Sequence, residues 1–169
     1  QPLRLDGTPD YSSATAVTSV SAEIKDTRAL IVAVTGYSDD IRDHLLPGAG
    51  HDSLYIGDAL TQLSVPTNII SNPSKPQFLK AVRDFSSFDG RKLLYLAGVG
   101  TFDGADAAFH VRTDSPFPKF YEEETAVRIG ELVGILCSSD KPCLLLLDMG
   151  LERIDDIFTD GSGGRTSGA

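Results

Sequence analysis

The sequence has little cysteine, little positive charge and no long apolar run. Its two cysteines, Cys137 and Cys143, lie six residues apart, and no metal-ligand spacing surrounds them. One falls on an expected helix face and the other opens an expected buried strand, where cysteine usually serves as a small apolar side chain. This pattern predicts two structural free thiols in a reducing compartment, and hence a cytoplasmic protein.

Basic residues are outnumbered by acidic ones, 15 to 24, which gives a formal net charge of −9. Nucleic acids and anionic membrane surfaces require basic patches, so this balance excludes both as main partners and favours a basic ligand. No apolar stretch reaches the roughly 18 residues that span a bilayer, and no apolar signal core follows the N-terminus. The sequence predicts a soluble protein.

A chain of 169 residues is long enough for one domain with a sizeable core. Three parts are predicted: a polar N-terminal arm over 1–28, a folded domain over 29–159, and a Gly/Ser-rich tail over 160–169. The tail has almost nothing to bury, which is typical of a flexible loop or linker.

Four apolar runs alternate with helical patterns of ten to fifteen residues. This alternation predicts right-handed crossovers and a mostly parallel sheet with helices on both faces, an α/β fold. Strands are expected at 29–34, 67–71, 92–97 and 142–147. Helices are expected at 53–63, after the capping box formed by Ser74 and Gln77, and around 129–136. A hairpin arm is expected at 107–114.

Two of these runs, LLYLAGVGTF (93–102) and CLLLLDMGLE (143–152), end in small, flexible residues. Functional side chains of parallel sheets gather beyond the carboxyl ends of the strands, which places Val99 and Gly150 side by side at one rim. Neither residue can carry a proton or attack a carbonyl. The frame suits catalysis, but the residues that it presents do not.

The order of the motifs resembles the caspase and metacaspase superfamily of cysteine peptidases over about residues 28–151. It runs from the first strand through LPGAGHDSL (46–54), with its Gly-x-x-x-Asp spacing, to LYLAGVG (94–100), a hairpin, a helix and LLLLDMG (144–150). The resemblance implies a caspase-like three-layer fold in which a catalytic histidine and cysteine would stand at positions 99 and 150. Val99 and Gly150 there imply an inactive pseudoprotease that serves as a regulatory or binding partner.

Two other functions stay open. One is a metacaspase-like, Arg- or Lys-directed cysteine endopeptidase whose dyad has been replaced in this chain, and the other is a purely structural scaffold. A relocated dyad is disfavoured because His44, His51 and His110 stand away from the rim and Cys143 opens its strand at the wrong end.

Asp52 and Asp148 match two positions that line the primary specificity pocket of metacaspases and hold an Arg or Lys side chain. Carboxylates bind guanidinium bidentately, so the resemblance implies a pocket for a basic side chain, with basic peptides as ligands. Two further pocket positions fall on Ala49 and Ala97, where polar residues are common in the family. Alternatively, Asp52 only caps a helix that begins at Ser53, and Asp148 only fixes a turn after the fourth strand.

In the family, a flexible segment after the cysteine strand is cut, and two more strands follow in a small subunit. The resemblance therefore implies processing at Arg165 or beyond, with the last strands absent from this chain. We expect a partner, either a small-subunit segment or a second caspase-like chain, because a bare fourth strand leaves an exposed apolar edge.

No cofactor is expected. Some metacaspases bind calcium through loop carboxylates, but the acidic residues available here lack EF-hand spacing and indicate a solvated acidic surface. The stretch GVGTFDG (98–104) lacks the lysine and the third glycine of phosphate-binding loops. The acidic residues in question are Asp114, Glu122, Glu123, Asp155 and Asp156.

Overall fold

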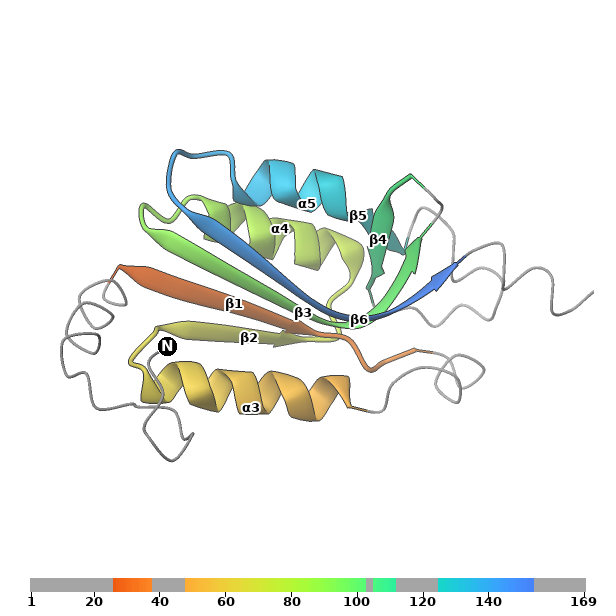
Figure 1. Cartoon of the computed structure of the whole chain (residues 1–169), viewed down its shortest axis with the longest axis horizontal. Helices are drawn as coiled ribbons and strands as arrows, with labels where there is room; N and C mark the ends of the chain where they lie inside the picture. The colour runs from red at the N-terminus through yellow and green to blue at the C-terminus, as the bar shows by residue number, and fades with distance from the viewer. Residues whose placement is uncertain (1–25, 38–47, 103–104, 112–124, 154–169) are drawn as a thin grey trace, which may run out of the picture.

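A computed structural model describes residues 26–37, 48–102, 105–111 and 125–153. Over these ranges the chain is an α/β fold, with a mixed sheet of six strands and three helices (Figure 1). In chain order the elements are β1 (Thr27–Ala33), α3 (Ala49–Gln62), β2 (Thr67–Ser71), α4 (Lys75–Ser86), β3 (Arg91–Phe102), β4 (Ala107–His110), β5 (Ala126–Arg128), α5 (Ile129–Leu136) and β6 (Cys143–Arg153).

The predicted parallel sheet is confirmed. β1 pairs in parallel with both β2 and β3, and β3 pairs in parallel with β6. The expected hairpin is present as β4 and β5, which run antiparallel to the carboxyl end of β3 and to each other. β3 is therefore the central strand, and its two long edges carry β6 on one side and β1 followed by β4 on the other.

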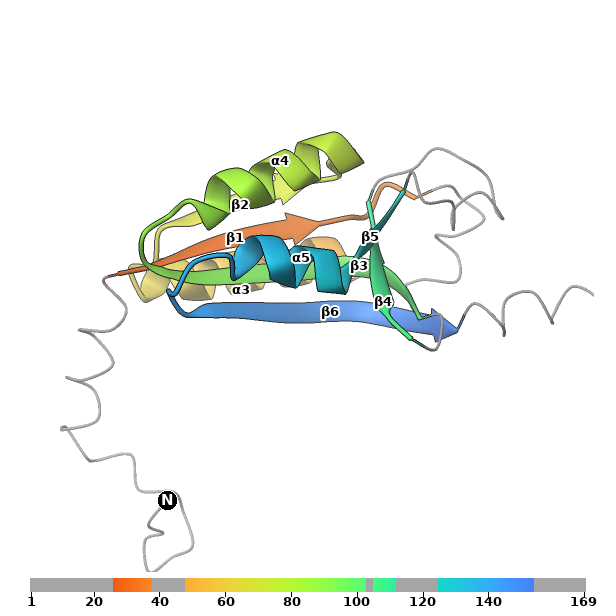
Figure 2. The same ribbon diagram turned by 90° about the horizontal axis from the view of Figure 1, so that it is seen from above.

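Helices cover both faces of this sheet, as predicted (Figures 1 and 2). The larger core lies between the sheet and α4 and α5, and the smaller lies under α3. Because both faces are covered, the inner strands are apolar at nearly every position. The larger core includes Leu30, Val32, Leu94, Leu96, Phe78, Val82, Leu132 and Leu136, and the smaller consists of Ile31, Ala49, Tyr95 and Ala97.

Local sequence sets the boundaries of α4. The capping box is confirmed: the Ser74 backbone N–H donates to Gln77 Oε1 at 2.9 Å, and Pro76 stands in the first turn, where its missing N–H costs no hydrogen bond. Phe78 and Val82, four residues apart, are both completely buried. The helix is thus amphipathic, with its apolar stripe on the larger core.

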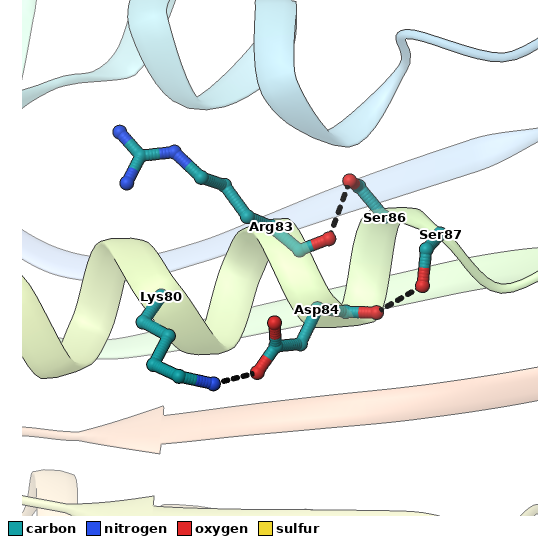
Figure 3. A network of polar contacts seen from close by, with 5 residues as sticks. All are labelled: Lys80, Arg83, Asp84, Ser86 and Ser87. Carbon is teal, nitrogen blue, oxygen red and sulfur yellow. Dashed lines mark hydrogen bonds and ion pairs between the residues drawn. The ribbon is translucent and has the colours of Figure 1, made fainter.

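The outer face of α4 is held by short-range polar contacts (Figure 3). Lys80 Nζ lies 2.5 Å from Asp84 Oδ2, one helical turn further on. The Ser86 and Ser87 hydroxyls donate to the carbonyl oxygens of Arg83 and Asp84, at 2.8 and 2.7 Å. The two serine hydroxyls thus satisfy carbonyl oxygens in the last turn of the helix, which have no N–H partner within it. The exposed ion pair between Lys80 and Asp84 adds well under ~1 kcal/mol to the stability of the fold.

Several predicted boundaries were wrong. The first helix begins at Ala49 rather than at 53, because Gly48 serves as its N-cap. The third and fourth strands run on to Phe102 and Arg153 because they pair with each other along their whole length. Val99 and Gly150 accordingly lie inside paired strands rather than beyond their ends. The first strand begins at Thr27, two residues before its predicted start at 29, and ends at Ala33 rather than at 34.

The prediction of two free thiols was also wrong, because Cys137 and Cys143 form a disulfide. Cys137 ends α5 and Cys143 opens β6, so the bridge closes the turn between them. Lys92 also contacts this turn. Its side chain is buried, and Nζ donates to Ser139 Oγ at 2.9 Å and to the Phe88 carbonyl oxygen at 3.1 Å. The sequence spacing alone did not reveal this pairing.

None of the helices in the described ranges is long and apolar enough to cross a membrane. The predicted tail at 160–169 and most of the arm at 1–28 lie outside the described residues. So do Arg165, His44 and the candidate calcium ligands, namely Asp114, Glu122, Glu123, Asp155 and Asp156.

Gly98 lies where three segments meet. Its φ is +157°, and a Cβ added there would come within 2.7 Å of the Tyr37 hydroxyl oxygen and 3.2 Å of the Val34 carbonyl oxygen. That hydroxyl accepts a hydrogen bond from the Val99 N–H at 2.9 Å and donates to the His110 carbonyl at 3.0 Å. Any side chain at position 98 would therefore displace the group that joins β3, β4 and the segment after β1.

We predict that Gly98→Ala lowers the free energy of unfolding by about 2 kcal/mol, because the added methyl group overpacks this junction. The measurement is urea denaturation followed by circular dichroism. Gly134→Ala is the matched control: nothing lies within 4 Å of a Cβ at that position on α5, so it should raise stability by about 0.5–1 kcal/mol. Equal effects of the two substitutions would contradict the packing described for Gly98.

Replacing both cysteines with serine should lower the free energy of unfolding by about 2 kcal/mol, because the unfolded chain regains the conformational entropy that this short disulfide loop removes. Denaturation with and without dithiothreitol measures it: the reductant should destabilise the natural chain and leave the Cys137→Ser/Cys143→Ser variant unchanged. Alkylation of the unreduced, unfolded chain, followed by intact mass, should add no label. Two labels would show that the thiols are free.

Candidate functional site

The pairing of β3 with β6 brings the predicted site residues together. Val99 is the register partner of Gly150, and Ala97 is the register partner of Asp148. The two positions implied for a catalytic dyad are thus direct neighbours, as expected. Val99 is only 2% exposed and packs within the larger core. On the other side of β3, Val99 is the register partner of His110 on β4, so the expectation that His110 stands away from this position was wrong.

Asp148 is held by a tyrosine of the neighbouring strand. The Tyr95 hydroxyl donates to Asp148 Oδ2 at 2.5 Å. The ring of Tyr95 belongs to the smaller core, and the residue is 5% exposed, whereas Asp148 is exposed. The tyrosine therefore anchors one carboxylate oxygen and leaves the rest of the carboxylate open to solvent.

Asp52 lies in the first turn of α3 and is also exposed. Its carboxylate folds back over the start of the helix, so that a Cβ added to Gly48 would lie 2.9 Å from Asp52 Oδ2. The positive end of the helix dipole stabilises an acidic group at this position. No side-chain hydrogen bond caps the helix, however, and Asp148 lies inside β6 rather than in a turn. Neither purely structural alternative describes these two residues.

Both Asp148 and Asp52 affect the pKa of Tyr95. Burial raises the pKa of Tyr95 above its ordinary value, and the hydrogen bond to Asp148 and the charges of Asp148 and Asp52 raise it further. Both carboxylates thus act on the same phenol. Among the described residues, neither carboxylate has a cationic partner. Both carboxylates are exposed, with Asp52 in the first turn of α3 and Asp148 on β6.

Ala49 and Ala97 lie beneath this pair. They are 5% and 0% exposed and belong with Tyr95 to the smaller core. Their side chains are apolar and offer no polar group to a ligand. The resemblance placed them at the specificity pocket, and in the structure both belong to the smaller core.

Sequence reasoning missed the two tyrosines that organise this region. Tyr95 lies in a continuous apolar run. Because a buried tyrosine usually finds a hydrogen-bond partner, its hydroxyl group was the one signal in the sequence that a polar contact is formed there. The carboxylate in the other apolar run, Asp148, was the candidate partner. Tyr37 carried no comparable signal, because its partners are backbone groups.

The structure describes two of the three histidines, His51 and His110. His110 is completely buried, with Nε2 2.8 Å from the Thr101 hydroxyl, and His51 is exposed on the first turn of α3. Within the described ranges, no three His, Cys, Asp or Glu side chains are grouped closely enough to hold a metal ion. The described residues of this region supply two exposed carboxylates and a buried tyrosine that donates a hydrogen bond to one of them.

A separate hollow of about 440 Å³ lies at the other end of the sheet, between α4 and the starts of β1 and β2. Arg28 and Asp84 are its charged residues, and Arg28 also stacks on the Phe88 ring, 4.2 Å from its centroid. The hollow lies beside the amino ends of the strands, whereas Asp148 lies near the middle of β6. It does not contribute to the acidic pair.

The chain matches no protein-family model and no curated protein.

We predict that Asp148→Asn lowers the pKa of Tyr95, because a phenolate would no longer face an anion. Asp52→Asn should lower it less, since Asp52 acts through its charge alone. The absorbance change of tyrosine at alkaline pH measures this pKa, and Tyr95→Phe identifies the contribution of Tyr95 itself. A titration that Asp148→Asn leaves unaltered would contradict the hydrogen bond.

The same shift makes stability depend on pH. Tyrosine in the unfolded chain ionises near ~10, whereas folded Tyr95 ionises at higher pH, so the unfolded state loses its proton first. The contribution of Tyr95 to stability is therefore fully present below pH ~10 and is lost as the pH rises beyond that value.

Proposed function

We propose that this chain is a caspase-like domain without peptidase activity, a pseudoprotease that binds a basic side chain of a regulatory partner. The observation that carries the proposal is the exposed pair of Asp52 and Asp148, joined through Tyr95 and placed beside two positions that have no catalytic group. The site keeps the means to hold a cation and lacks the means to cleave.

The surroundings of Val99 support inactivity. Its side chain is buried in the larger core, and its N–H is already bound by the Tyr37 hydroxyl. A histidine at this position would have to bury a polar ring among apolar side chains, at a cost of about 1–3 kcal/mol. This favours the pseudoprotease over an endopeptidase whose dyad has merely been replaced.

The charges support a basic ligand. One oxygen of Asp148 accepts the Tyr95 hydroxyl, and its second oxygen and the carboxylate of Asp52 remain available. Guanidinium offers donors in a planar fork that suits carboxylate oxygens, and the net charge of −9 attracts cations from a distance. We propose an Arg- or Lys-containing segment as the ligand, carried by a small-subunit segment or a second caspase-like chain.

The disulfide bears on where this function takes place. The cytoplasmic location expected from the sequence rested on free thiols. Disulfides persist mainly in oxidising compartments, and the Cys137–Cys143 bridge therefore favours such a compartment over the cytoplasm.

A fluorescein-labelled peptide with a central arginine should bind the chain at least ~10-fold more tightly than the same peptide with glutamine, because the charged hydrogen bonds are lost. Asp148→Asn and Asp52→Asn should each weaken binding of the arginine peptide by about 5- to 10-fold. Fluorescence anisotropy at fixed ionic strength measures this. Asp58→Asn, which removes an exposed carboxylate further along the same helix, is the matched control and should leave affinity nearly unchanged.

Cleavage assays separate the proposal from the peptidase alternative. The natural chain and the Val99→His/Gly150→Cys variant should both leave Arg- and Lys-aminomethylcoumarin substrates intact. Hydrolysis after basic residues by the folded double variant would overturn the proposal in favour of the endopeptidase. Equal affinity for the arginine and glutamine peptides would contradict the binding function, and the structural scaffold would be the remaining alternative.

A further inference from the structure

The Cys137–Cys143 disulfide holds its two sulfur atoms in different surroundings. It closes the turn between α5 and β6, at the end of the sheet where the parallel strands begin (Figure 1). Cys137 is exposed, whereas Cys143 is half-buried and packs against the larger core. A thiol in solution therefore reaches Cys137 more easily than Cys143.

Lys92 lies beside this bridge. It is the register partner of Cys143 on the neighbouring strand, and register partners carry their side chains on the same face of a sheet. Its N–H donates to the Pro142 carbonyl oxygen at 3.0 Å, and its Nζ donates to Ser139 Oγ at 2.9 Å. The lysine is 2% exposed and thus contacts the bridged segment, residues 138–142, near both of its ends.

The buried ammonium group of this lysine pairs with no acidic side chain of the described residues. Its hydrogen-bond acceptors are neutral: Ser139 Oγ and the carbonyl oxygens of Phe88 and Gly90. Lys141, in the bridged segment, differs in this respect, since its Nζ lies 3.3 Å from Asp89 Oδ1. A buried charge without a counter-ion is costly, so an anion formed beside it is stabilised. Cleavage of the disulfide forms such an anion, a thiolate.

We propose that this disulfide is a thiol-exchange site, at which a small monothiol attaches to Cys137. The incoming thiol first loses its proton to solvent. Its thiolate then bonds to Cys137 Sγ, the bond between the two cysteine sulfurs breaks, and the electron pair of that bond leaves with Cys143 as a thiolate. The product is a mixed disulfide on Cys137 and one thiolate on Cys143.

The charges around the bridge assign the leaving group. Lys92 stabilises a thiolate on Cys143, and a stabilised thiolate leaves faster. Cys137 is the C-cap of α5, where the negative end of the helix dipole disfavours an anion. Access and charge thus agree on attack at Cys137. Cys143 lies on the face of the larger core and Asp148 on the opposite face, so the inference does not depend on the proposed function.

The first experiment locates the adduct on the natural, oxidised chain. Excess glutathione serves as the monothiol, and samples are quenched with acid at short times, because protonated thiols do not exchange. Digestion with pepsin at low pH and tandem mass spectrometry then show which cysteine carries glutathione. We expect at least ~10-fold more adduct on Cys137 than on Cys143. Equal amounts, an excess on Cys143, or a disulfide that glutathione leaves intact would overturn the proposal.

The second experiment measures the effect of Lys92 on the rate of opening, followed by intact mass after acid quenching and alkylation. Lys92→Met removes the ammonium group, keeps a long side chain and should slow opening by about 3- to 10-fold. Lys141→Met is the matched control, because it removes the lysine of the bridged segment, and it should change the rate by less than ~2-fold. Circular dichroism verifies that both variants are folded.

The direction of the change separates this role from a structural one. If Lys92 only supported the turn, its loss would loosen the bridge and speed its opening. Equal or faster opening of folded Lys92→Met would therefore overturn the stabilisation of the Cys143 thiolate. If Lys92→Met does not fold, the position of the adduct on the natural chain still decides the proposal.

Discussion

The parallel pairing of β3 with β6 is the interaction on which the rest of the structure depends. Eleven consecutive residue pairs, from Lys92 with Cys143 to Phe102 with Arg153, hold the two strands in register. A shift of one residue would turn every side chain of β6 to the opposite face. Asp148 would then leave Tyr95, and the row of leucines would change places with the residues that pack on the larger core.

Polar groups placed inside apolar strands protect this register. Tyr95 reaches Asp148 near the middle of the two strands, and Lys92 reaches Ser139 near their amino ends. A buried polar group that loses its partner costs about 1–3 kcal/mol, so each contact penalises a slipped pairing. The Cys137–Cys143 bridge fixes the start of β6 covalently. The strand that carries the candidate site is thereby secured at its start and near its middle.

The same strand is covered unequally on its two sides. Inward, it contributes Cys143, Leu145 and Met149 to the edge of the larger core. Outward, its main-chain groups pair with no other described strand, and Leu144 and Leu146 are exposed beside Asp148. This asymmetry is what the proposed function uses: a rigid frame presents charge to a partner, and it needs neither nucleophile nor base. Binding places fewer demands on a site than catalysis, because a reacting atom must be held within a fraction of an ångström.

The sequence by itself determined the alternation of strands and helices, the parallel sheet, the capping of α4 and the presence of Val and Gly, which have no catalytic group, at positions 99 and 150. These features depend on neighbours along the chain, on periodicity and on residue type, all of which can be seen without coordinates. The tertiary structure alone decided which groups meet. The contact of Tyr95 with Asp148 spans 53 residues, and that of Tyr37 with Val99 spans 62. Such contacts, like the disulfide, arise from sheet register and helix packing, which no local pattern encodes.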